Sequence, residues 1–122
     1  MATQPRPVRY RCELYANIAE AEGDSRARVL EMSESGAFIE EAEGFDDRQV
    51  GDEATLTLAL PGGDPWSGRF RISRLGTSRR ELKDPRVEHV TVAVRGYGVE
   101  FLELHDDELE RLRDFLELLE LR

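Results

Sequence analysis

Three arginines near the amino terminus are the residues best suited to chemistry in this sequence. Arg6, Arg9 and Arg11 lie close together, and residues 1–11 contain no acidic side chain. A guanidinium group presents fixed hydrogen-bond donors that match a phosphate or the edge of a guanine base. These arginines are therefore candidates for contacts with a phosphate or a base. The simpler alternative is that these arginines belong to a solvated terminal tail.

Side chains that commonly serve in catalysis or metal binding are few. His89 lies in an expected strand and His105 just before an expected helix, with no metal-ligand spacing between them. The single cysteine, Cys12, falls on the apolar side of its strand, which predicts a buried, inert thiol. Ser33 lacks the flanking glycines of a nucleophile elbow. We therefore expect no enzymatic activity, no metal site and no cofactor.

The charge balance limits the partners. Asp and Glu number 26 against 17 Lys and Arg, and the formal net charge is −9. Such a charge opposes non-specific binding to DNA or to an acidic membrane. No apolar run approaches the ~20 residues of a membrane span, and the first residues lack the apolar region of a signal peptide. We expect a cytoplasmic protein with no nucleic-acid partner and no membrane span.

Alternating hydrophobicity predicts strands along most of the chain. From Val8 to Ile18, apolar residues occupy the even positions and mostly polar residues the odd ones, as in a half-buried strand. Residues 76–86 are polar and are expected to form a loop. Further strands are expected at residues 26–32, 37–40, 52–60, 66–75, 87–94 and 97–102. Six or seven short strands joined by turns predict a mainly β fold, a small antiparallel barrel or sandwich.

The pattern changes to helical spacing near the end of the chain. The apolar residues there recur every three or four positions, at Leu109, Leu112, Phe115, Leu116 and Leu119. This predicts one amphipathic helix over residues 106–121. Its apolar stripe is expected to be buried, either against the barrel or at a seam with another chain, so both a monomer and a homodimer remain open. The length of 122 residues suits a single domain, residues 1–122.

A motif in the middle of the chain resembles a known family. The segment from Glu31 to Ile39 is similar to the second signature of PilZ domains, which places Ser two residues after Asp or Asn and Gly three residues later. Two further segments resemble the family's strands, Gly51 to Pro61 and Tyr97 to Phe101, and a helix follows them. The resemblance covers nearly all of residues 6–119. Taken alone, the segment from Ser33 to Gly36 is more typical of a simple turn or bulge, and the ordered family features on both sides favour the signature instead.

The resemblance implies a fold and a ligand. PilZ domains are small split-type β-barrels, here expected over residues 8–102 with a flexible, arginine-containing lead-in at 1–7. They commonly bind cyclic di-GMP, a bacterial second messenger with two phosphates and two guanines. Arginines can pair with its phosphates or stack on a base, a carboxylate can accept from a guanine edge, and glycine lets the backbone approach. The binding residues implied in this chain are Arg6, Arg9, Arg11, Glu31, Ser33 and Gly36.

The implied role is a regulatory module in cyclic di-GMP signalling, acting on a protein partner of a motility, pilus or secretion system or of exopolysaccharide production. Two departures from the family pattern predict weak binding. The family's first signature has two arginines four positions apart, whereas Pro5 stands four before Arg9 and Arg6 lies one step away. Glu31 stands in place of the shorter Asp or Asn. The alternative is a PilZ-like adaptor that no longer binds nucleotide and acts without ligand.

Overall fold

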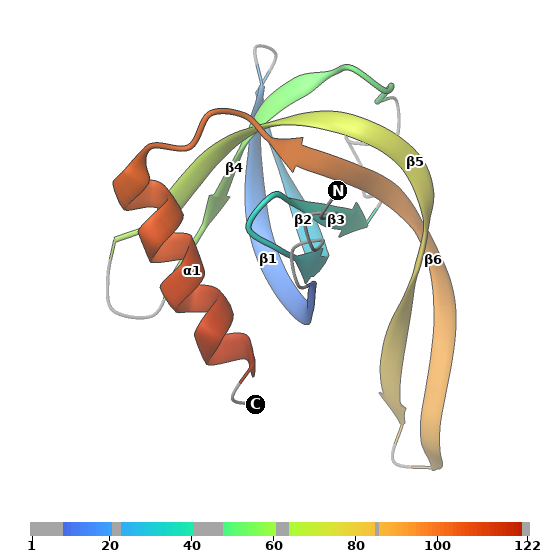
Figure 1. Ribbon diagram of the computed structural model, residues 1–122. Coiled ribbons are helices and arrows are strands. Elements are labelled where there is room, and N and C mark those ends of the chain that lie inside the picture. Colours follow the sequence, from blue (N-terminus) through green and yellow to red (C-terminus); the bar gives the residue numbers. More distant parts are fainter. Residues whose placement is uncertain (1–8, 21–22, 41–47, 61–63, 85, 121–122) are drawn as a thin grey trace, which may run out of the picture.

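The computed structural model describes residues 9–20, 23–40, 48–60, 64–84 and 86–120. Within them, six antiparallel strands form a closed barrel in the order β1-β2-β3-β6-β5-β4, and one helix follows (Figure 1). The elements are β1 Tyr10–Glu20, β2 Gly23–Met32, β3 Gly36–Glu40, β4 Glu53–Leu58, β5 Trp66–Asp84, β6 Val87–Phe101 and α1 Asp106–Glu120. The predicted fold class is confirmed. The predicted lead-in at residues 1–7, with Arg6, lies outside the described residues.

The barrel interior is built from the apolar side of each alternating strand. In β1, Ala16 and Ile18 are buried, whereas Tyr15 and Asn17, which alternate with them, are exposed. The same alternation in β4 buries Leu56 and Leu58. Successive side chains of a strand point to opposite faces, so one face of each strand fills the core and the other meets solvent. The alternation that predicted these strands is therefore the pattern of core burial.

The helix α1 packs against this barrel. Leu112, Phe115 and Leu116 are buried and belong to the same apolar cluster as the strand residues. The indole N–H of Trp66 in β5 donates to the carbonyl oxygen of Glu108 at 2.9 Å, which attaches the first turn of the helix to the barrel. The predicted burial of the helix stripe is confirmed, and the surface that covers it is the barrel of the same chain.

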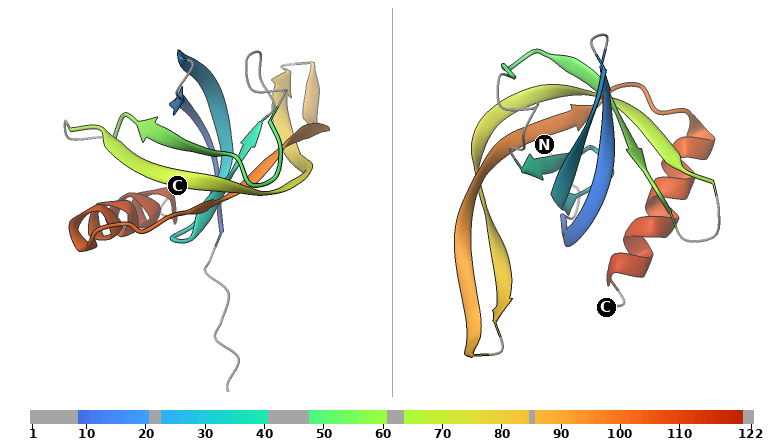
Figure 2. Two further views of the ribbon diagram at one scale, coloured as in Figure 1. Left: turned by 90° about the horizontal axis from the view of Figure 1, so that it is seen from above. Right: turned by 180° about the vertical axis from the view of Figure 1, so that it is seen from behind.

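The expectation of a polar loop at residues 76–86 is wrong. Strand β5 continues to Asp84, and β5 and β6 pair beyond the barrel as a two-stranded arm, from Gly76 opposite Gly96 to Asp84 opposite Val87. A ribbon with no core beneath it needs no alternation of apolar and polar residues, so the sequence there looks like a loop. The arm and α1 lie on opposite sides of the barrel (Figure 2).

Candidate functional site

A row of residues on the outer face of the barrel brings together distant parts of the sequence. Directly opposed residues of neighbouring strands point to the same side of a sheet. The strand registers define this row as Arg11, Glu31, Phe38, Gly98 and Arg74, on β1, β2, β3, β6 and β5 in turn. At one end of the row, the carboxylate of Glu31 lies next to Arg11. Arg74 stands at the other end.

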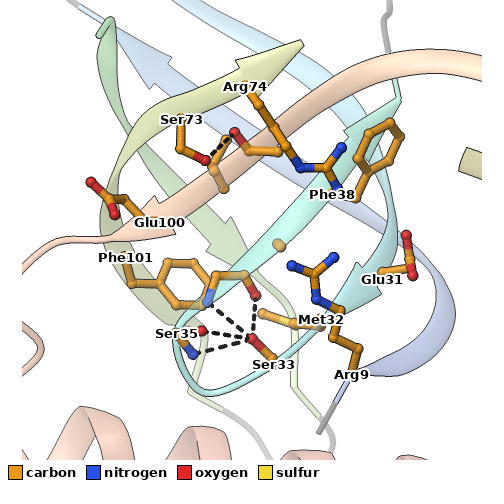
Figure 3. A pocket seen from close by; sticks show the side chains of 14 residues that line it. Arg9, Glu31, Met32, Ser33, Ser35, Phe38, Ser73, Arg74, Glu100 and Phe101 are labelled. Carbon is orange, nitrogen blue, oxygen red and sulfur yellow. Dashed lines mark hydrogen bonds between the residues drawn. The ribbon is translucent and has the colours of Figure 1, made fainter. Parts of the chain in front are cut away.

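A pocket of about 320 Å³ opens over the middle of this row (Figure 3). It contains four of the residues that the family resemblance implies, namely Arg9, Glu31, Ser33 and Gly36. Arg11 stands opposite Glu31 but does not line the pocket. The remaining lining residues are Met32, Ser35, Ala37, Phe38, Ser73, Arg74, Gly98, Val99, Glu100 and Phe101. The volume is at the lower end of the range for small-molecule sites.

Ser33 shapes the turn between β2 and β3. Its hydroxyl oxygen accepts from the backbone N–H groups of Ser35 and Gly36, both at 3.2 Å, and its own N–H donates to the Gly36 carbonyl at 2.8 Å. Serine hydroxyls bond to nearby backbone in this way and fix turn geometry. Ser33 is only 5% exposed. The serine therefore holds the wall of the pocket in place, and the turn is more than a passive connection.

Gly36 is required by the close approach of two strands. It pairs with Glu100 of β6, and a Cβ atom at this position would collide with the carbonyl oxygen of Val99. A side chain here would push β3 away from β6 and widen the pocket. Glycine at position 36 is therefore required for the packing of β3 against β6, and it also leaves the pocket floor free of a side chain.

Glu31 is already engaged by the arm. The hydroxyl of Ser78 in β5 donates to Oε2 of Glu31 at 3.0 Å, across the wall of the pocket. Glu31 is half-buried, and its backbone opposes Arg11 on one side and Phe38 on the other. The carboxylate is therefore held at the edge of the pocket, where a ligand donor would have to share it with Ser78.

Arg9 enters the pocket from the start of β1. It is exposed, and its side chain points into the pocket from the side of Met32 (Figure 3). It comes from the segment just before Tyr10, where β1 begins. A cation at the mouth of the pocket is placed to pair with an anionic group of a ligand.

Sequence reasoning missed Arg74. This arginine lies in β5 and points into the pocket from the side opposite Arg9 (Figure 3), with its guanidinium carbon 5.7 Å from the centre of the Phe38 ring. The register of β5 against β6 shifts between Ile72 and Arg74, which marks a β-bulge. The only sign of this bulge in the sequence is the loss of alternation after Ile72.

Cys12 is a free thiol in the described part of the chain. The thiol of Cys12 donates to the carbonyl of Val29, and burial, with smaller effects of Glu31 and Glu13, raises the pKa of Cys12 to about 12. The thiol stays protonated at neutral pH, in agreement with the predicted inert cysteine. His105 is exposed, and the side chain of His89 lies outside the described part of the chain. Among the described residues no group of three or more His, Cys, Asp or Glu could hold a metal ion.

Comparison with family models decides the relationship. The model of the PilZ domain matches residues 3–118, almost the whole sequence. This chain belongs to the PilZ domain family. The resemblance drawn from the motif at residues 31–39 is thereby confirmed. No curated protein matches the sequence.

Solved PilZ structures share the fold. The chain is similar to the PilZ domain of YcgR from Escherichia coli, solved with c-di-GMP, with 17% identity and a TM-score of 0.69, covering 97% of this chain and 92% of that one. It is similar to MrkH, a c-di-GMP-dependent transcription regulatory factor, with 15% identity, a TM-score of 0.73 and coverage of 98% and 52%. It is also similar to the Bacillus subtilis inhibitor of motility, MotI, with 20% identity, a TM-score of 0.68 and coverage of 98% and 53%. The PilZ domain described here spans about half the length of the last two proteins. No helix in the described part of this chain is long and apolar enough to span a membrane.

Proposed function

We propose that this PilZ domain binds cyclic di-GMP in the pocket beside the β2–β3 turn and acts as a non-enzymatic regulator in the bacterial cytoplasm. The domain regulates a protein partner, which in turn controls motility, pili, secretion or exopolysaccharide production. The observation that supports this best is the pocket itself, because it gathers Arg9, Glu31, Ser33 and Gly36 around one opening. Family membership supplies the ligand class, and the YcgR domain of the same fold was solved with this ligand.

The pocket chemistry fits a guanine dinucleotide. Arg9 can pair with a phosphate, since charge-assisted contacts between arginine and phosphate are strong and geometrically defined. Glu31 can accept from the N1 and N2 donors of guanine, because an ionised carboxylate only accepts hydrogen bonds. The turn held by Ser33 supplies a fixed backbone wall, and Gly36 leaves it free of side chains.

Weak affinity follows from two features of this chain. Glu31 is longer than Asp by a methylene group, and its carboxylate already accepts from Ser78. The N-terminal segment lacks a pair of arginines at the four-residue spacing of the family. We expect a dissociation constant in the micromolar range or weaker, which corresponds to a binding free energy of about −8 kcal/mol or one less favourable than this.

Contacts of the pocket turn offer a route from ligand to partner. Glu34, within the β2–β3 turn, forms an ion pair with Arg113 of α1. The carbonyl of Ser35 in the same turn accepts from the N–H of Phe101 at 2.8 Å, just before the chain continues toward the helix. A ligand that binds against this turn would alter the exposed surface shared by the turn and the helix. We propose that the partner recognises this surface after the N-terminal arginines have closed over the ligand.

Restoring the family pattern should tighten binding. In the double variant Pro5→Arg with Glu31→Asp, an arginine stands four residues before Arg9 and the carboxylate is shortened. We expect affinity for cyclic di-GMP to rise tenfold or more, because one charge-assisted contact is worth roughly 1.5–3 kcal/mol. Isothermal titration measures the change, and the circular dichroism melting curve controls for folding. A folded double variant that still ignores cyclic di-GMP would contradict ligand sensing and favour the ligand-independent adaptor.

A further inference from the structure

A β-bulge in β5 redirects Arg74 from the barrel interior to the pocket. Phe70 and Ile72 point into the core, so uninterrupted alternation would also place residue 74 inside. The register shift inserts Ser73 as an extra residue, and its hydroxyl donates to the carbonyl of Gly98 at 3.1 Å. Arg74 then stands opposite Gly98, which belongs to the outer row of the pocket. Bulges commonly re-aim a side chain in this way next to functional sites.

The surroundings of Arg74 hold its guanidinium group in a defined place. Phe38 points to the outer face of the barrel, yet it is only 1% exposed, and the Arg74 guanidinium lies over its ring. Glycines make room for the long side chain, since a Cβ atom at Gly98 would come within 2.7 Å of Cγ of Arg74, and one at Gly76 within 2.7 Å of Nη1. A guanidinium that lies over an aromatic ring uses no hydrogen bond in this contact, so its N–H donors remain available to a ligand.

The charges around the pocket suit a base at this position better than a phosphate. Among the described residues, Arg74 forms no ion pair, so its donors are available. Two carboxylates, Glu31 and Glu100, line the same pocket. Glu100 is paired with Arg71, whereas Glu31 can accept from donors of a base. A guanine offers donors to a carboxylate at N1 and N2 and acceptors to an arginine at O6 and N7. Adenine carries a donor at the position of O6 and does not match this pair.

We propose that Arg74 binds the O6 and N7 edge of a guanine of cyclic di-GMP. It thereby supplies from β5 the arginine that the N-terminal segment lacks at the spacing of the family signature. This inference rests on the proposed function, because it assumes that cyclic di-GMP occupies the pocket. Arg74 acts as a specificity-determining residue, and Arg9 remains the partner of the phosphate.

A thermodynamic cycle tests this contact by combining one change in the protein with one change in the ligand. Titrations compare cyclic di-GMP with its 7-deazaguanine analogue, which lacks N7, on the unaltered protein and on Arg74→Ala. Removing either partner of a bidentate contact is expected to weaken binding roughly tenfold. On Arg74→Ala the analogue should bind as well as cyclic di-GMP itself. Arg79→Ala is the matched control, since Arg79 is exposed in the same strand and does not line the pocket, and it should bind both ligands as the unaltered protein does.

The outcomes separate this inference from the proposed function. If Arg74→Ala binds cyclic di-GMP as tightly as the unaltered protein, or if it loses affinity for both ligands equally, the guanine contact is wrong while cyclic di-GMP binding stands. If the unaltered protein binds neither ligand, both proposals fall. Arg74→Met provides the test should Arg74→Ala unfold, because methionine keeps a long apolar stem against Phe38 but carries no hydrogen-bond donor. It should show the same loss for cyclic di-GMP and the same indifference to N7.

Discussion

Replacing Leu112 with alanine is expected to lower the free energy of unfolding by about 2–5 kcal/mol, the range for truncating a buried leucine. Leu112 is 1% exposed and lies in the shared core of helix and barrel. Leu118, in the same helix, is 51% exposed. Leu118→Ala should therefore stay within about 0.5 kcal/mol of the unaltered protein. Urea unfolding followed by circular dichroism measures both changes, and equal effects of the two substitutions would contradict the packing of α1 on the barrel.

Removal of the whole helix should have a larger consequence. A chain ending at Leu104 loses the cover of the apolar cluster and the contact between Trp66 and the carbonyl of Glu108. Exposed apolar surface of this kind promotes aggregation, so we expect an insoluble or self-associating product in size-exclusion chromatography. A soluble monomer that unfolds cooperatively would instead show that α1 is a separate arm for a partner.

Arg9→Ala is expected to reduce affinity for cyclic di-GMP more than tenfold. The substitution removes a charge-assisted contact worth roughly 1.5–3 kcal/mol, and the exposed position of Arg9 means that the barrel should remain intact. Arg26→Ala is a matched control, because it removes the same charge from an exposed site that does not line the pocket. Isothermal titration at one salt concentration compares them. Unchanged binding by Arg9→Ala, or the same loss in both variants, would show that Arg9 makes no specific contact.

The sequence predicted those parts of the molecule that bury side chains. Ala16 and Ile18 alternate with polar residues because one face of β1 meets the core, and Leu112, Phe115 and Leu116 recur at helical spacing because one face of α1 does so. The β5 half of the arm, residues 76–84, escaped prediction for the opposite reason, whereas the β6 half was expected as a strand at residues 87–94. This half of the arm pairs through its backbone outside the barrel, and its polar sequence carries no alternation that would indicate a strand.

The candidate site was predictable only in part. Glu31, Ser33 and Gly36 are recognised through a local motif and Arg9 through its arginine-rich segment, and the fold brings all four to one pocket. The place of Arg74 depends on the bulge at Ser73 and on the pairing of β5 with β6, both of which are properties of the tertiary structure. The bond between Ser78 and Glu31 joins residues 47 positions apart and likewise has no local signal. The roles of these side chains in ligand binding stay predictions until they are measured.

Isothermal titration of the unaltered protein with cyclic di-GMP tests the proposed ligand most directly. GMP at the same concentration serves as the control, since it offers one guanine and one phosphate without the cyclic dinucleotide. We predict saturable binding of cyclic di-GMP with a dissociation constant in the micromolar range or weaker, and much weaker binding of GMP. Nanomolar binding would contradict the weakening ascribed to Glu31 and to the missing arginine. Absence of saturable binding at millimolar cyclic di-GMP would contradict the proposed function itself.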